Sequence, residues 1–179
     1  MRYMLEPSGP SYGMNVTIAQ LAERHFEQLR AVLDAVAREQ RYLALFEAPP
    51  TQDSFAFYRR LLADGQCHVA LQDAAVVGWC DIQPAFGHAR KHIGILGMGL
   101  LPAFRHRGIG TALLSAAVAA AWARGLTRIE LTVREDNANA KRLYERLGFR
   151  SEGLHKQSML VAGQYHDCYS MALLRAHAA

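Results

Sequence analysis

The stretch LLPAFRHRGIGTALL, residues 100–114, joins an apolar run to an alanine-rich segment through a turn of arginines and glycines. Four such residues fall within six positions: Arg105, Arg107, Gly108 and Gly110. A surface turn needs at most one glycine, and the helix predicted over 108–124 begins directly at this turn. The composition therefore indicates a turn built to receive something negatively charged.

A strand followed by a glycine-containing turn and a helix N-terminus can bind an anion. The first N–H groups of a helix have no partner within it, and the helix dipole adds partial positive charge there. Arginines add directional donors, although a tight turn with arginines in solvent is the other interpretation. Two nucleotide-binding motifs are excluded: no lysine follows Gly110, as a Walker loop requires, and GMGLLP (97–102) places proline where a Rossmann fingerprint needs glycine.

The segment before this turn predicts two helices and four strands. Apolar residues recur near the 3.6-residue period over 19–39, and Thr51 or Asp53 could cap a second helix at about 53–64. The predicted strands are 14–18, 68–72, 75–84 and 91–101. Three glycines inside the last of them, Gly94, Gly97 and Gly99, predict a distorted strand.

The segment after the turn adds a strand over 128–133, a helix within 136–149 capped by Asp136 or Asn137, and two strands joined by a turn at 162–164. The resulting order, β–α–α–β–β–β–α–β–α–β–β, predicts an α/β (α+β) fold around one largely antiparallel sheet.

Two motifs in this order resemble the GNAT superfamily of acyl-CoA-dependent N-acetyltransferases. The residues of 105–110, RHRGIG, are similar to its (Q/R)xxGx(G/A) pyrophosphate-binding motif. Downstream, its NxxAxxLYxxxGF signature is matched by Asn137, Ala140, Leu143, Tyr144, Gly148 and Phe149. The resemblance covers roughly 14–174 and is closest to the bacterial branch that acetylates amino acids and small amines. It implies about seven strands, about four helices and splayed central strands.

The resemblance implies acetyl-CoA as cosubstrate and no metal. Backbone amides from about Arg107 to Thr111 would hold the pyrophosphate, and the pantetheine arm would lie between the splayed strands. The cosubstrate-binding residues that the resemblance implies are Met98, Gly99, Leu100, Arg105, His106, Arg107, Gly108, Ile109, Gly110, Thr111, Asn137, Ala140, Arg142 and Tyr144.

Tyr144 is the expected general acid that protonates the departing thiolate, because a phenol stays protonated at neutral pH. A core tyrosine is the competing interpretation of that position. The base that deprotonates the amine is left open among Glu47, His92 and Asp167, with Asp81 a weaker candidate. Residues 41–50, with Tyr165 and His166, are expected to line the acceptor pocket.

Length and composition lead to further expectations about the core, the domain organisation and the location of the protein. The chain has 179 residues, of which 51% are hydrophobic and 20% charged, so a full core is expected. Residues 1–13 are predicted to be a flexible leader without the apolar core of a signal peptide, and 14–179 a single acyl-CoA N-acyltransferase domain. No apolar run is long enough to span a bilayer, so a cytoplasmic protein is expected.

The cysteines, the histidines and the net charge do not indicate other kinds of site. The three cysteines are far apart and predicted to be structural thiols, and the eight histidines show no metal-ligand spacing. A net charge of +4 does not indicate a nucleic-acid-binding surface. A homodimer is expected by analogy alone. The alternatives to a small-molecule enzyme are an acetyltransferase for protein N-termini or ribosomal proteins, and a non-catalytic acyl-CoA sensor.

Overall fold

A computed structural model describes residues 16–176, so the predicted leader and the first two residues of the predicted first strand lie outside the described residues. The sheet has seven strands in the order β1-β2-β3-β4-β5-β7-β6. They are β1 (Val16–Gln20), β2 (Cys67–Gln72), β3 (Ala75–Pro84), β4 (Ile93–Leu100), β5 (Arg128–Arg134), β6 (Arg150–Val161) and β7 (Gln164–Leu174). Among the described strands only β4 and β5 pair in parallel, which confirms the mixed, largely antiparallel sheet.

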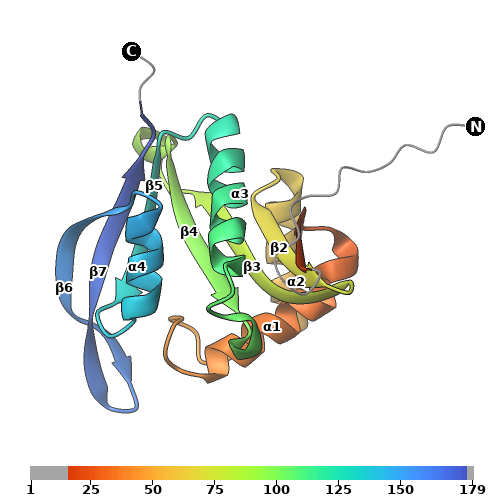
Figure 1. Cartoon of the computed structure of the whole chain (residues 1–179), viewed down its shortest axis with the longest axis horizontal. Coiled ribbons are helices and arrows are strands. Elements are labelled where there is room, and N and C mark those ends of the chain that lie inside the picture. The colour runs from red at the N-terminus through yellow and green to blue at the C-terminus, as the bar shows by residue number, and fades with distance from the viewer. Residues whose placement is uncertain (1–15, 177–179) are drawn as a thin grey trace, which may run out of the picture.

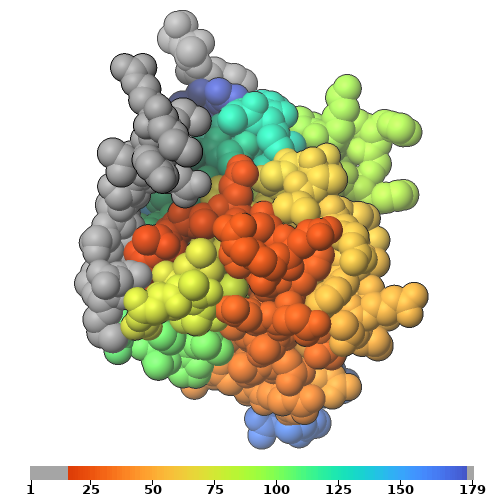
Figure 2. Space-filling model, turned by 90° about the vertical axis from the view of Figure 1, so that its right-hand side faces the viewer, coloured from red at the N-terminus to blue at the C-terminus, as the bar shows by residue number. Residues whose placement is uncertain are grey.

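Within the described residues four α-helices cover the two faces of this sheet: α1 (Phe26–Arg38), α2 (Thr51–Ala63), α3 (Ile109–Ala123) and α4 (Ala138–Arg146). Short 3-10 turns η1 (Glu23–His25), η2 (His88–Arg90) and η3 (Pro102–Phe104) complete the order. Figure 1 shows α3 and α4 in front of the sheet, and Figure 2 shows the outer surface that α1 and α2 form on another side.

Two apolar clusters form the core, one on each face. Cys80 packs in the cluster that contains α3 and β5, whereas its neighbour Trp79 packs in the cluster that contains α1 and α2. Successive side chains of a strand point to opposite faces, so β3 contributes to both clusters. All three cysteines are buried and free, which confirms the prediction of structural thiols.

Two predictions at the N-terminal half were wrong in detail. The chain over Ala19–Gln20 pairs with β2, and α1 begins only at Phe26, so sheet pairing overrides the helical pattern predicted over 19–39. Neither Thr51 nor Asp53 caps α2. Pro50 occupies the N-cap position without a side-chain bond, and the Ser54 hydroxyl instead donates to the Pro49 carbonyl at 3.0 Å.

The glycine-rich strand β4 pairs regularly with β3 but pairs with β5 over only part of its length. Residues of β4 pair with β3 one for one from Gly94 to Leu100, so the predicted distortion is absent on that side. Pairing with β5 stops after Ile95↔Glu130, and the two halves of the sheet diverge from there (Figure 1). The predicted splayed central strands are therefore present.

The glycines of β4 make room for side chains of β3. A Cβ at Gly99 would overlap the six-membered ring of Trp79, and a Cβ at Gly97 would lie 3.2 Å from the Asp81 carboxylate. These contacts are a close approach of one strand's side chains to the backbone of the next.

Replacing Gly99 by alanine should therefore displace the Trp79 ring. Overpacking of this kind costs about 1–3 kcal/mol of unfolding free energy, measurable by urea denaturation. Gly153→Ala is the matched control, because its new Cβ would lie 3.4 Å from the Ser170 hydroxyl, an ordinary contact. Equal stability of the two variants would contradict this account.

Candidate active site

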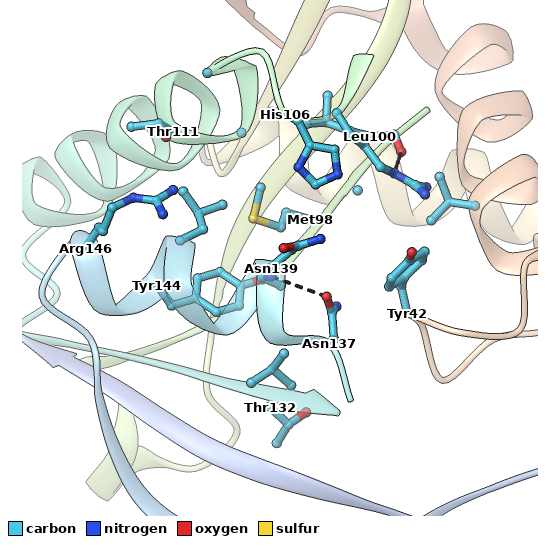
Figure 3. A pocket seen from close by; sticks show the side chains of 18 residues that line it. Tyr42, Met98, Leu100, His106, Thr111, Thr132, Asn137, Asn139, Tyr144 and Arg146 are labelled. Carbon is cyan, nitrogen blue, oxygen red and sulfur yellow. Dashed lines mark hydrogen bonds between the residues drawn. The ribbon is translucent and has the colours of Figure 1, made fainter. Parts of the chain in front are cut away.

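The gap between β4 and β5 opens into a cavity of about 440 Å³ (Figure 3). Leu101 N donates to the Val77 carbonyl and Ala85 N to the Ile93 carbonyl, which identifies the odd-numbered residues of β4 as those bonded to β3. Because bonding directions alternate along an antiparallel strand, the backbone groups of Met98 and Leu100 face the gap. The Leu100 carbonyl accepts from Arg105 Nε, whereas backbone groups at such an edge without a partner can exchange hydrogen bonds with the amides of an extended ligand.

The mouth of this cavity is the N-terminus of α3. Gly108 is the N-cap residue with φ +81°, a left-handed conformation that favours glycine. The first intrahelical bond is donated by Ala112 N, and no side chain caps the helix, so the N–H groups over 109–111 precede the helical ladder. Donors of this kind, together with the helix dipole, are able to bind an anion. A Cβ at Gly108 would meet nothing within 4 Å, so backbone conformation rather than space restricts this position.

Arg105 ties the turn to two other elements. Its guanidinium pairs with both Glu39 carboxylate oxygens beyond the end of α1, with Nη1 to Oε2 at 2.8 Å, and its Nε donates to the Leu100 carbonyl at 2.9 Å. The Tyr42 ring lies 4.7 Å from the guanidinium carbon. Hydrogen bonding to Glu39 raises the pKa of Arg105. Through these contacts the Arg105 guanidinium holds the turn in place.

Asn137 has two separate polar groups at the start of α4. Its side-chain carbonyl oxygen accepts from Ala140 N at 3.3 Å, which confirms the predicted cap. The cap uses only that oxygen, so the amide nitrogen is available to a ligand. Capping and ligand binding therefore do not compete for the same atom.

Tyr144 enters the cavity from α4 (Figure 3). Its side chain is 7% exposed, and its ring packs 5.7 Å from the Phe149 ring centroid. Burial is the main cause that raises the pKa of Tyr144, and nearby Cys80 adds to it. The hydroxyl is therefore protonated at neutral pH and able to donate a proton. Tyr144 is both a core residue and a cavity residue, so the two interpretations of the sequence describe the same side chain.

Most of the expected cosubstrate residues meet in this cavity. Those that line it are Met98, Gly99, Leu100, Arg105, His106, Gly108, Gly110, Thr111, Asn137, Ala140 and Tyr144. Three others do not: Ile109 is buried in the core, Arg107 stacks on Phe104, and the exposed Arg142 donates to the Asn139 side chain.

Several lining residues were not predicted to bind the cosubstrate, although Leu143 belongs to the quoted signature and Tyr42 to the segment 41–50 expected at the acceptor pocket. They are Val36, Tyr42, Thr132, Val133, Asn139, Leu143 and Arg146. Helical periodicity could have found three of them, because Asn139, Leu143 and Arg146 stand at i, i+4 and i+7 on α4. Arg146, one turn beyond Arg142, is the cation that α4 presents to the cavity.

The three candidate bases lie away from this cavity. Glu47 is exposed and pairs with Arg38 at 3.2 Å. His92 is exposed at the opposite end of β4 from Met98. Asp167 pairs with Lys156 at 2.6 Å, which is the main cause that lowers the pKa of Asp167. Asp167 lines a separate depression together with Tyr165 and His166, so those two side chains also lie outside the cavities around β4.

Asp81, the candidate given least weight, lies beside the cavity. A second cavity of about 240 Å³ shares one lining residue, Met98, with the first. Its wall includes Asp81, Gly97 and the loop segment Leu43–Leu45, so part of 41–50 contributes as expected. Two neutral donors hold the Asp81 carboxylate, Trp79 Nε1 at 3.1 Å and Gln83 Nε2 at 2.8 Å. Burial raises the pKa of Asp81 to about 6.

Two other kinds of site find no support in the described part of the chain. Within residues 16–176 no three His, Cys, Asp or Glu side chains converge as metal ligands would. Of the helices in that range, none is both long and apolar enough to cross a bilayer.

Known proteins resemble this chain over most of its length. The acetyltransferase (GNAT) family model matches residues 29–149. The L-amino acid N-acetyltransferase AaaT of Escherichia coli K12 is 30% identical over 165 residues, which cover 89% of this chain and 98% of that protein.

Solved structures share the fold. An acetyltransferase of the GNAT family from Streptococcus pneumoniae matches with a TM-score of 0.82 and 25% identity, covering 89% of this chain and 99% of that one. The structure of yncA from Salmonella typhimurium, solved with its cofactor acetyl-CoA, matches with a TM-score of 0.86 and 20% identity, covering 92% and 97%. The latter likeness shows the fold alone.

Asp81→Asn should stabilise the protein at alkaline pH. A carboxyl whose pKa is raised from 3.8 to about 6 holds its proton more tightly in the folded state, so stability falls as pH rises through that interval. Asparagine does not ionise. The free energy of unfolding of the variant should therefore exceed that of the parent by at most about 3 kcal/mol at pH 8 and should equal it at pH 3.5.

Thermal unfolding at the two pH values measures this difference. Asp73→Asn is the control: Asp73 is an exposed turn residue with φ +47°, a conformation that asparagine tolerates. An Asp81→Asn variant that is less stable than the parent at pH 8, while Asp73→Asn is unchanged, would contradict the burial argument.

Proposed function

The chain belongs to the GNAT family of acetyltransferases, and from this premise we propose that it transfers the acetyl group of acetyl-CoA to the primary amine of a small molecule. The observation that carries the proposal is that two cavities share Met98 as a lining residue, one with the N-terminus of α3 at its mouth and one with a buried carboxylate. A donor and an acceptor bound in them would meet at the end of the open strand edge.

The residues fit the cosubstrate. The N–H groups over 109–111 are uncapped by side chains and suit its diphosphate, and the Met98 backbone faces the gap where its extended arm would lie. The Asn137 amide nitrogen adds a donor, and Arg146 adds positive charge. Acetyl-CoA, when bound, supplies an activated acetyl thioester. Arg105 supports this site by holding the turn through Glu39.

Proximity and proton transfer account for the chemistry. Holding amine and thioester side by side removes most of the entropic barrier. The amine nitrogen forms a bond with the acetyl carbon, the carbon–sulfur bond breaks, and the Tyr144 hydroxyl protonates the departing thiolate. Its raised pKa supports this role because the proton is present at neutral pH.

The acceptor is proposed to be small. The second cavity holds about 240 Å³ and lies among α1, α2 and the loop at Leu43–Leu45, which favours a small amine over a protein N-terminus. The name of the Escherichia coli relative supports an amino acid or a related amine. A homodimer and a cytoplasmic location stay predictions.

Thiol release from acetyl-CoA over a panel of primary amines tests the function directly. We expect turnover with at least one small amine and acetylated product of matching mass. A protein that binds acetyl-CoA but releases no thiol above its hydrolysis rate with any amine would be the non-catalytic sensor instead.

Tyr144→Phe should lower kcat about 100-fold or more, because general acid catalysis contributes roughly 10²–10⁴, and should leave the Kd for acetyl-CoA within about threefold. Tyr165→Phe is the control, since Tyr165 is 61% exposed and outside both cavities. Unchanged kcat in the Tyr144 variant would remove this residue from the chemistry.

Gly108→Asp should weaken acetyl-CoA binding by about 30-fold or more, measured by calorimetry. A carboxylate at the helix N-terminus would repel the diphosphate, and a tenfold change in Kd corresponds to about 1.4 kcal/mol. Gly108→Asn isolates the charge, because both side chains enter open space and tolerate a positive φ about equally. Equal affinities of the two variants would argue against an anion at this turn.

A further inference from the structure

Asp81 is a buried carboxylate without a cation. Its side chain belongs to a residue 4% exposed, and within residues 16–176 it takes part in no ion pair. Its two partners, Trp79 and Gln83, are neutral donors on the same face of β3. Charges in protein interiors are normally paired, so the arrangement lacks a positive charge.

The titratable neighbours do not supply that charge. From β2, Cys67 lies opposite Asp81 in the sheet; from α2, Tyr58 approaches; along β3, Cys80 is adjacent. Burial raises the pKa of all three groups, so each is neutral near pH 7. Arg30 on α1 opposes the rise in the pKa of Tyr58, but its Nε donates to the Pro49 carbonyl and the residue does not line the cavity.

The cavity around Asp81 is otherwise apolar. No basic side chain of the described residues lines it. Apart from Asp81, Gln83 and the glycine, its wall consists of Leu29, Leu33, Leu43, Ala44, Leu45, Phe57, Tyr58, Leu61, Trp79 and Met98. An aliphatic and aromatic wall with one carboxylate suits a ligand with an apolar body and a single positive charge.

We infer that this cavity binds an apolar primary amine that carries no carboxylate, and that Asp81 holds its ammonium group and takes its proton. The inference rests on the proposed function and narrows its acceptor class. It places the acceptor nitrogen beside Gly97, next to Met98, the residue that lines both cavities.

The proton balance is complete with these groups. The ammonium gives one proton to an Asp81 oxygen and becomes a neutral amine, whose lone pair forms the carbon–nitrogen bond. The nitrogen loses a second proton as the amide forms, while the thiolate that leaves takes one from Tyr144. That second proton restores Tyr144 through solvent, and Asp81 releases the first one, so each turnover yields amide, thiol and one proton.

A free amino acid fits this cavity poorly. Its carboxylate is separated from the ammonium by one carbon and would lie close to Asp81, where the described wall offers no cation. Like charges repel strongly in a medium of low polarity, and an unpaired buried carboxylate loses its hydration. The chain therefore differs from what the name of its Escherichia coli relative would suggest.

Matched acceptors test this on the parent protein. 2-Phenylethylamine and L-phenylalanine share the aromatic body and an ammonium group and differ in the carboxylate. We expect kcat/KM to be at least about tenfold higher for 2-phenylethylamine than for L-phenylalanine. L-Phenylalaninamide, which lacks the carboxylate, should have a kcat/KM closer to that of 2-phenylethylamine. Equal or better turnover of L-phenylalanine would overturn the inference and leave the proposed function intact.

Asp81→Asn tests the residue. This substitution should lower kcat/KM for 2-phenylethylamine about 100-fold or more. The Kd for acetyl-CoA should be unchanged, and a thermal-unfolding measurement should show that the variant is folded. The kcat/KM of the parent should decrease as pH falls through about 6, where Asp81 gains a proton. The kcat/KM of the variant should not show this decrease. Asp73→Asn is the control for the loss of one carboxylate. A variant within about threefold of the parent would overturn the assignment.

Calorimetry separates failure of the inference from failure of the function. 2-Phenylethylamine is titrated into the parent and the Asp81→Asn variant, each saturated with CoA, so no turnover is needed. Binding to the parent alone supports the cavity's assignment even if no amine releases thiol, in which case the proposed function fails. Equal binding to both proteins, or binding to neither, overturns the assignment.

Discussion

The loss of pairing between β4 and β5 after Ile95 is the constraint on which the site depends. Up to that residue the strands form one sheet, and beyond it β5 continues with β7 while β4 continues with β3. A strand that loses one neighbour keeps half of its backbone groups unpaired, and buried backbone groups need partners. The gap is therefore a place where a ligand with its own amides can complete the sheet.

Long-range contacts hold the open end of this gap in shape. Arg105 joins the turn before α3 to Glu39 after α1, and the same guanidinium donates to the last carbonyl of β4. Asn137 begins α4 on the other side of the gap and directs Tyr144 inward. The walls of the cavity thus come from segments that are far apart in the sequence but fixed by a few directional bonds.

Local patterns predicted most elements and the motif residues, because apolar periodicity and glycine positions are local properties. The turn at Gly108 and the cap at Asn137 were correctly anticipated from residue type. The start of α1 was not, because pairing of Ala19 with Val69 depends on a strand fifty residues away. The burial of Asp81 was not predicted for the same reason: nothing around this residue in the sequence shows that its carboxylate lies over Gly97 of β4.

The two cavities have opposite electrostatic character, and this sorts their ligands. The first combines a helix N-terminus with Arg146 and would favour an anion, whereas the second contains a carboxylate among apolar side chains and would favour a cation. An isolated buried carboxylate destabilises the fold when it ionises, so Asp81 is unfavourable for the empty protein at neutral pH. A bound ammonium would offset that cost, which means the binding free energy of the right acceptor includes the relief of a penalty built into the fold. An acceptor with its own carboxylate would add to the penalty instead, so the same residue would favour one class of amine and reject the other.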